Sequence, residues 1–156
     1  MPTIYLSPST QEFNEYADGL GTEEEWMNRL ADAMEPQLTA SGIRFTRNTP
    51  DMTAASSIQA SNAGSYDLHL ALHTNASGSG QAGRNRGILA FYYPGSPRGQ
   101  RAAEFFVDGL KAIYPLPALV RTEPTTTIGE VRRTRAPAVH LDLGFHDNPE
   151  DEQWIV

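Results

Sequence analysis

The hydrophobic and polar positions of the chain alternate with a period of two in several short segments. The clearest is residues 66–73, in which every second residue from Leu68 to Leu72 is a leucine on one side of an extended strand. His69 and His73 fall on the other side, and a polar stretch follows at once. We predict further strands from similar apolar runs at residues 4–6, 43–46, 87–93 and 138–143.

Other segments carry a helical period. Apolar residues recur at helical spacing from Trp26 to Met34, with Thr22 as the N-cap and Glu25 placed to complete a capping box. Pro36 is expected to kink or end this helix. Further helices are predicted at residues 53–63 and 102–113, a polar loop at 75–86 and irregular chain at 115–127. Strands that alternate with helices predict an α/β fold of three layers, a mostly parallel sheet flanked by helices on both faces.

Length and charge narrow the classes of partner. The 156 residues predict a single domain over residues 1–156. A net charge of -7 argues against nucleic acid or an anionic membrane as the main partner, because both are polyanions. No apolar run is long enough for membrane insertion. The first residues, Met1 to Leu6, lack the basic region of a signal peptide and are expected to form a strand.

The chain has no cysteine, so a bound metal would need histidine and carboxylate ligands, a set that suits zinc. His73 lies where a buried strand meets a loop, a position typical of ligand sites in open α/β sheets. Asp142 lies between two leucines in the last strand and needs a partner if it is buried. His140 shares its face, about 6.6 Å back along the strand. His69 lies about 13 Å from His73 along its strand, so we expect a core histidine there.

Four segments together resemble the zinc-dependent N-acetylmuramoyl-L-alanine amidases, and the resemblance covers nearly the whole chain. Residues 72–76 resemble the family's S-I-H-A-N, residues 45–47 its strand ending in T-R, and residues 21–28 its helix start with a metal-binding Glu four residues before an Asn. The longest match is residues 137–152, which resemble P-A-V-L-V-E-V-G-F-x-x-N-P-E-D-E. The family cleaves peptidoglycan between the lactyl group of muramic acid and L-alanine.

The resemblance implies roles for particular residues. Glu24 and His73 would be metal ligands for Zn²⁺, and Asp142 occupies the place of the catalytic glutamate. Asn75 and Arg133 would contact the substrate, with Arg133 facing a carboxylate. Two structural alternatives remain: acids in the first turn of a helix favour its dipole, and an arginine in a basic run is often simply solvated.

The sequence departs from the family pattern at two site positions. The family's first strand usually ends in D-P-G-H, whose His is a ligand, and Thr10 stands at that place here. Gln11, His140 or water is then expected as the third ligand, and a Ser-Pro-Ser-x-Gln start marks a variant subgroup. The second departure is Asp142, which is one methylene shorter than the family's glutamate. The family's final helix is expected to be cut short, because the chain ends at its start.

These observations predict a zinc amidase that acts on peptidoglycan of the bacterial cell wall, with Asp142 as general base. One alternative is a catalytically weakened amidase-like module that binds wall peptides, which the changes at Thr10 and Asp142 favour. Another is a metallohydrolase of similar fold that cleaves a different amide. The cell wall lies outside the cell, so the protein would reach it after lysis, as spore and phage enzymes do, or as part of a longer exported chain.

Overall fold

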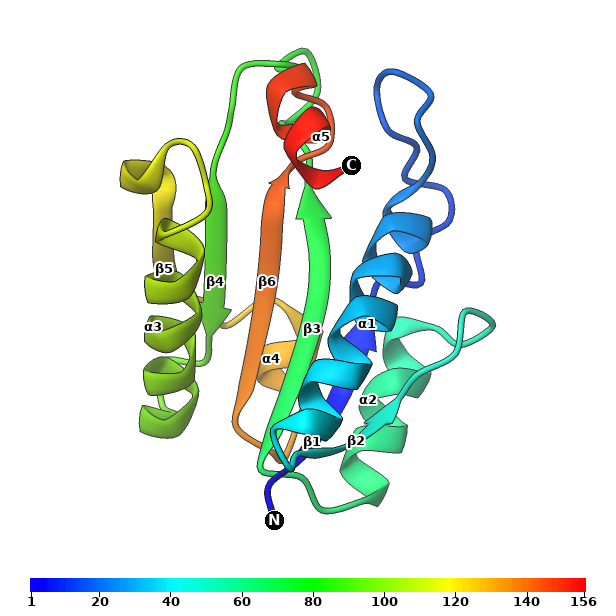
Figure 1. The fold of residues 1–156 in the computed structure, drawn as a ribbon, viewed down its shortest axis with the longest axis vertical. Coiled ribbons are helices and arrows are strands. Elements are labelled where there is room, and N and C mark those ends of the chain that lie inside the picture. The colour runs from blue at the N-terminus through cyan, green and yellow to red at the C-terminus, as the bar shows by residue number, and fades with distance from the viewer.

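A computed structural model describes residues 1–156 and contains one six-stranded sheet (Figure 1). The strands are β1 (Thr3–Pro8), β2 (Arg44–Arg47), β3 (Leu68–Asn75), β4 (Ile88–Tyr92), β5 (Val120–Pro124) and β6 (Ala138–Phe145). The helices are α1 (Glu23–Ala40), α2 (Ala54–Ala63), α3 (Pro97–Lys111), α4 (Gly129–Arg132) and α5 (Pro149–Ile155), with a 3₁₀ turn η1 (Pro117–Leu119). The strand order is β2-β1-β3-β6-β4-β5, and only the β4–β6 pair is antiparallel. The predicted α/β class is confirmed.

One face of the sheet is apolar and carries the core. The leucines of β3 point to this face, as the alternation predicted, and pack with side chains of α1 and α3 such as Met27 and Val107. Both helices lie in front of the sheet in Figure 1. Since the core occupies one face, the polar groups that strands β3 and β6 bury must lie on the other.

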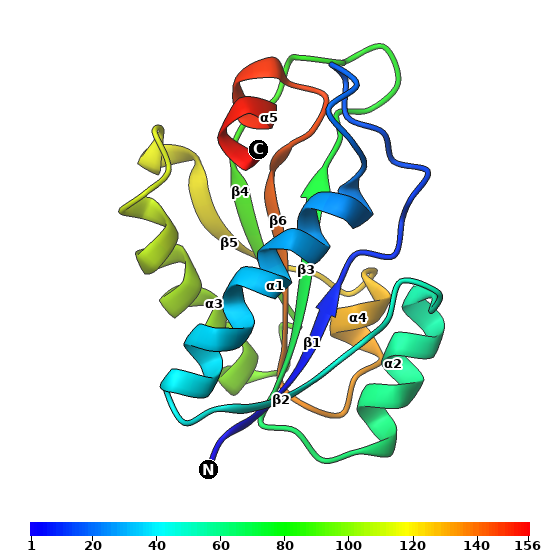
Figure 2. The ribbon, with the colours of Figure 1, turned by 45° about the vertical axis from the view of Figure 1, so that its right-hand side comes forward.

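The opposite face of the sheet is unusually polar for a buried surface. In the strand register, His69 of β3 is the partner of Ala138 of β6, and His73 is the partner of Asp142. His140 lies between Ala138 and Asp142 on β6. All four polar side chains in this set are buried. Helices α2 and α4 cover this face, behind the sheet in Figure 1. Figure 2 shows that the chain following β1 and the chain following β3 leave the sheet at the same end.

The structure corrects three details of the sequence prediction. Helix α1 continues through Pro36, which lies on the exposed side, where the carbonyl that loses its donor can be hydrated. Residues 115–127 contain β5, an edge strand too short and polar to be recognised by alternation. Thr22 caps α1 through the Glu25 N–H, but the Glu25 side chain pairs with Arg29 instead of closing a capping box. None of the helices combines the length and the hydropathy that a membrane span requires.

Candidate metal centre

His73 lies near the carboxyl end of β3, between two carboxylates. Its Nε2 is 2.7 Å from Glu130 Oε2, and its Nδ1 is 3.4 Å from Glu23 Oε2. Burial opposes a charge on the ring, but the hydrogen bonds and charges of Glu130 and Glu23 outweigh it and raise the pKa of His73 to about 10. Without a metal, His73 is therefore an imidazolium held by two acids.

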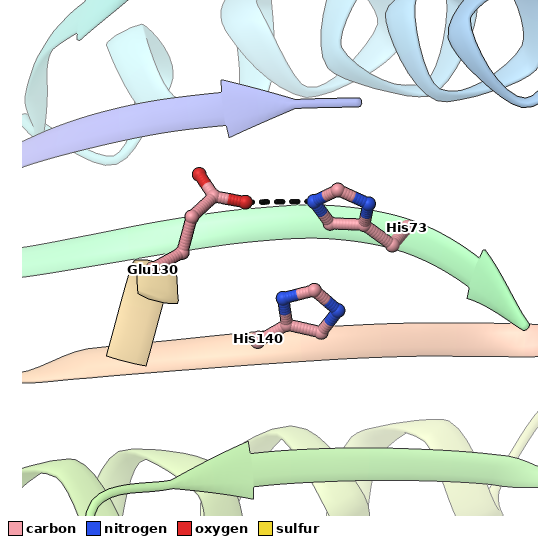
Figure 3. A group of neighbouring side chains, drawn as sticks. All are labelled: His73, Glu130 and His140. Carbon is pink, nitrogen blue, oxygen red and sulfur yellow. Dashed lines mark hydrogen bonds and ion pairs between the residues drawn. The ribbon is translucent and has the colours of Figure 1, made fainter. Parts of the chain in front are cut away.

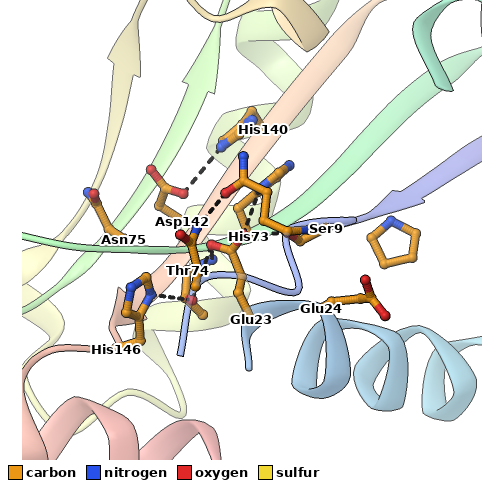
Figure 4. Close-up of polar contacts among 12 residues, drawn as sticks. Ser9, Glu23, Glu24, His73, Thr74, Asn75, His140, Asp142 and His146 are labelled. Carbon is orange, nitrogen blue, oxygen red and sulfur yellow. Dashed lines mark hydrogen bonds and ion pairs between the residues drawn. The ribbon is translucent and has the colours of Figure 1, made fainter. Parts of the chain in front are cut away.

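Glu23 is the first residue of α1 and is almost fully buried, with 1% of its surface exposed. The Ser9 hydroxyl donates to its Oε2, and the Thr74 N–H donates to Oε1 at 2.9 Å. Burial alone would raise the pKa of Glu23, but His73 and these two donors hold it below its usual range. Every oxygen of this carboxylate thus has a fixed partner (Figure 4).

Glu130 comes from α4, on the polar face of the sheet. The Ser7 hydroxyl donates to its Oε1, which also lies 3.2 Å from His69 Nε2. His69 Nδ1 in turn lies 2.9 Å from the Ser61 hydroxyl. Burial would raise the pKa of Glu130, but His69 and His73 hold it far below the usual range. His69, predicted to be a core histidine, therefore contacts the same carboxylate as His73, that of Glu130.

The ring of His140 stacks on the ring of His73, with centroids 4.2 Å apart and planes 10° apart. Its Nε2 lies 3.2 Å from Asp142 Oδ1. Its Nδ1 has no hydrogen-bond partner, although only 8% of His140 is exposed. An orphaned nitrogen at that depth is costly unless something else occupies it.

His73, Glu130 and His140 together form a group that fits a metal ion (Figure 3). One ligand atom from each lies within 4.8 Å of the others. Two imidazoles and one carboxylate form a ligand set used by catalytic zinc sites. The second nitrogen of each histidine faces another carboxylate, Glu23 or Asp142, an arrangement that fixes the ring orientation of zinc ligands.

The structure gives the other two predicted ligands, Glu24 and Gln11, neighbours other than His73. Glu24, the second residue of α1, is partly exposed, and burial and the nearby Glu12 raise its pKa. The side-chain oxygen of Gln11 accepts from Asn14 at 2.5 Å. The carboxylate at His73 is thus that of Glu23, one residue before the predicted ligand.

The two predicted substrate contacts come from different elements, Asn75 from β3 and Arg133 from the end of α4. Asn75 ends β3 and uses its side-chain oxygen to accept from the Ala76 N–H at 2.9 Å. Arg133 is the exposed C-cap residue of α4. Its backbone carbonyl accepts a hydrogen bond from the side chain of Asn62 on α2. Neither residue contacts His73.

Sequence reasoning missed Glu130. The only signal was an acid between Ile128 and Val131, which resembles the setting of Asp142 between two leucines. His146 is also buried, and its Nδ1 lies 2.8 Å from the Thr74 hydroxyl. Burial is the main cause that lowers its pKa.

A cavity of about 440 Å³ opens beside the metal group. His73 and Glu130 line its inner part, and the segment after β1 and the segment before α2 form its walls. Glu12 and Asp51 are the other acids among its lining residues, and no lysine or arginine lines it. The group that could hold a metal is therefore reachable from solvent through a polar, acidic cavity.

Comparisons with known proteins show the family and the fold of the chain. Residues 11–156 match the family model described as N-acetylmuramoyl-L-alanine amidase. The fold is similar to N-acetylmuramoyl-L-alanine amidase AmiC2 of Nostoc punctiforme, with a TM-score of 0.83 and 12% identity over 99% of this chain and 85% of that chain. It is also similar to the amidase of Clostridium difficile 630, with a TM-score of 0.85 and 17% identity over the same shares of the two chains. No match was found among curated protein sequences.

Proposed function

Because the chain belongs to the family of N-acetylmuramoyl-L-alanine amidases, we propose that it hydrolyses the lactyl–L-alanine amide of peptidoglycan with a zinc ion bound at His73. The family assignment rests on a match over residues 11–156. The zinc, its ligands and the catalytic base are the parts that this proposal adds.

The observation that carries the proposal is the orphaned nitrogen of His140. Its buried Nδ1 has no partner, and it belongs to a group in which His73 and Glu130 offer the other two ligand atoms. We therefore place the ligands at His73, Glu130 and His140. This set replaces Glu24, whose neighbour is Glu12, and Gln11, whose amide is engaged by Asn14.

Zinc bound there would supply a Lewis acid and a water of lowered pKa. The protein's own groups then have separate tasks. Glu23 holds His73 Nδ1, and Asp142 Oδ1 holds His140 Nε2, so both rings keep their orientation. The second oxygen of Asp142, which His140 does not engage, would be the proton acceptor that a general base supplies.

The substrate enters from the cavity of about 440 Å³ that reaches His73 and Glu130. Asn75, at the end of the same strand as His73, is the proposed contact for the amide group. Peptidoglycan as the substrate implies action on the bacterial cell wall.

The test is release of new L-alanine amino termini from purified peptidoglycan, with and without added zinc. We expect zinc-dependent release that falls about a hundredfold or more in Asp142→Asn, the range typical of a lost general base. Glu24→Gln is the matched control, because it removes one acid outside the metal group. Release that survives chelation, or that is lost equally in Glu24→Gln, would contradict the proposal.

A second candidate function is a wall-binding module without turnover. The observation that favours it is the direct 2.7 Å contact between His73 and Glu130, which satisfies both groups when no metal is present. Thr10 in place of the family's first histidine points the same way. Co-sedimentation with peptidoglycan in the absence of any zinc-dependent release would support this candidate over the enzyme.

A further inference from the structure

His146 follows β6 directly and lies where three segments of the chain meet. Its backbone N–H donates to the carbonyl of Asn75 at 2.9 Å, and its carbonyl accepts from the N–H of Ala17 at 3.3 Å. Its ring stacks on the ring of Tyr16, with centroids 5.4 Å apart and planes 7° apart. Only 7% of His146 is exposed. Because the backbone and the ring are both held, the direction of its Nδ1 is fixed.

The Nδ1 of His146 lies 2.8 Å from the hydroxyl of Thr74, which follows the proposed metal ligand His73 in β3. Two other groups contact the same hydroxyl: the Tyr16 hydroxyl at 3.4 Å and Glu23 Oε1 at 3.3 Å. The other oxygen of Glu23 lies 3.4 Å from Nδ1 of His73. A continuous series of contacts thus joins His146 to His73 (Figure 4).

The hydroxyl of Thr74 has one proton and can donate only once. Although burial opposes it, the contacts with His73 hold the pKa of Glu23 below its usual range, so this carboxylate is ionised and can only accept. Burial raises the pKa of Tyr16, so its hydroxyl keeps its proton and donates to Thr74. The Thr74 proton is directed at Glu23, and His146 must therefore donate from Nδ1. A neutral His146 then carries its single proton on Nδ1.

We propose that His146 is a positioning residue for the metal ligand His73, an inference that rests on the proposed function. It acts through two intermediates, the hydroxyl of Thr74 and the carboxylate of Glu23. Both oxygens of Glu23 accept from fixed donors, so His73 directs its Nδ1 proton at Oε2 and its Nε2 remains for a metal. His146 thereby helps to decide which nitrogen of His73 is the ligand.

Thr74 and His146 stand at positions where the family motifs do not specify this contact. In S-I-H-A-N, with its histidine at His73, an alanine stands at the place of Thr74. In F-x-x-N, the place of His146 is open to any residue. Alanine has no hydroxyl that could contact a carboxylate. The hydroxyl between His146 and Glu23 is therefore an addition of this chain to the motif.

The first test is zinc affinity, measured with zinc alone in competition with a chromogenic chelator. Groups that orient a metal-binding histidine typically change metal affinity by about 10–100-fold, and His146 acts one contact further away. We therefore expect His146→Phe, which keeps a ring beside Tyr16 but has no donor, to raise the Kd for zinc about tenfold. Thr74→Val, which keeps the shape and loses the hydroxyl, should do the same. Urea unfolding of the zinc-free variants reports any loss of stability separately.

Conservative variants separate positioning from packing. Thr74→Ser keeps the hydroxyl, and His146→Asn keeps an amide N–H near the place of Nδ1, so both should bind zinc nearly as tightly as the wild type. Thr122→Val is the matched control, because Thr122 lies on the edge strand β5, which β4 and β6 separate from β3. The double variant His146→Phe/Thr74→Val should lose no more affinity than either single variant, because both remove the same series of contacts.

The second test uses the zinc-free protein, so it is independent of the proposed function. In ¹⁵N spectra of the histidine rings at about pH 8, we expect neutral His146 to carry its proton on Nδ1. We also expect the Nδ1 proton signal of His73 to shift in Thr74→Val and in His146→Phe. It should keep its position in Thr74→Ser and in Thr122→Val. A change that acted only through packing would not follow the presence of the hydroxyl.

Equal losses of zinc affinity in Thr74→Val and Thr74→Ser would overturn the inference, as would losses that add in the double variant. A neutral His146 with its proton on Nε2 would also overturn it, because Thr74 would then donate to His146 and not to Glu23. A wild type that binds no zinc contradicts the proposed function, and the spectra of the zinc-free protein then decide the role of His146.

Discussion

The imidazole rings of His73 and His140 lie parallel and in contact, with centroids 4.2 Å apart. Two buried rings at that distance repel each other if both carry a proton, and His73 is already held as a cation by Glu130 and Glu23. The Nε2 of His140 faces Asp142, and its Nδ1 has no hydrogen-bond partner, so Nδ1 is the nitrogen available to a ligand. Zinc held by this pair of rings would take the place of a proton on His73, and the unpartnered Nδ1 of His140 would be its second nitrogen ligand.

Zinc should stabilise the folded protein, because a ligand that binds only the native state adds stability. At a free zinc concentration a hundred times Kd, the gain is about 2.7 kcal/mol. We expect a clear rise in Tm on adding zinc to chelator-treated wild type. His140→Asn should fold but lose most of that rise, whereas Glu24→Gln should keep it. Differential scanning fluorimetry measures all three, and a full zinc response in His140→Asn would exclude His140 as a ligand.

Glu130→Ala should destabilise the fold strongly. The carboxylate satisfies Ser7, His69 and His73, which would all be left buried without their partner. Removing one side of a buried charged network costs about 3–5 kcal/mol. The matched control is Glu123→Ala, whose carboxylate pairs with the exposed Arg121 and contributes about 0–1 kcal/mol. Urea unfolding measures both, and similar costs for the two variants would contradict the account.

The stability of the protein should fall as the pH drops below about 6.5, in part because of His146. Burial lowers the pKa of His146 in the folded state below its ordinary value of 6.5. The unfolded chain therefore binds more protons than the folded one in this range, so the contribution of a neutral His146 is complete above pH 6.5 and is lost as pH falls. His146→Asn should flatten this part of the profile. An NMR titration that gives His146 a pKa above 6.5 would reverse the expected sign.

Asp151 is expected to be the most sensitive residue of α5. It is fully buried, and its Oδ2 accepts from the backbone N–H of Gly87 and of Phe145, each at 3.0 Å. Its Oδ1 accepts from Arg86 at 2.9 Å and from the Tyr114 hydroxyl. Asp151→Ala leaves these donors unpaired and should cost about 3–5 kcal/mol.

Glu150→Ala provides the comparison for Asp151. Glu150 also pairs with Arg86, but 76% of its side chain is exposed, so its loss should cost about 0–1 kcal/mol. Trp154 lies on the same helix, so its fluorescence during urea unfolding gives both values. Equal costs for the two substitutions would show that burial of Asp151 contributes little.

The sequence was sufficient for the fold class and for the strands that carry His73 and Asp142, because alternation on a half-apolar sheet is a strong signal. The sequence was less informative about which residues at the start of a helix face the sheet. Glu23 and Glu24 differ by about 100° around α1, and motif spacing alone could not decide which one faces the sheet. Glu130 could not be predicted from the sequence for another reason. It lies on α4, which is a single turn, and it is 57 residues from its partner His73 in the sequence.

The most direct measurement is anomalous diffraction at the zinc edge from crystals of the chain grown or soaked with zinc. The account predicts a peak bonded to His73 Nε2, a Glu130 oxygen and His140 Nδ1, at about 2.0–2.2 Å from each. Extended X-ray absorption on the same protein should then show two imidazoles per zinc. A peak on the Nδ1 side of His73, bonded to Glu23 or Gln11 with His140 free, would contradict the ligand set, and the absence of any peak would contradict the zinc centre itself.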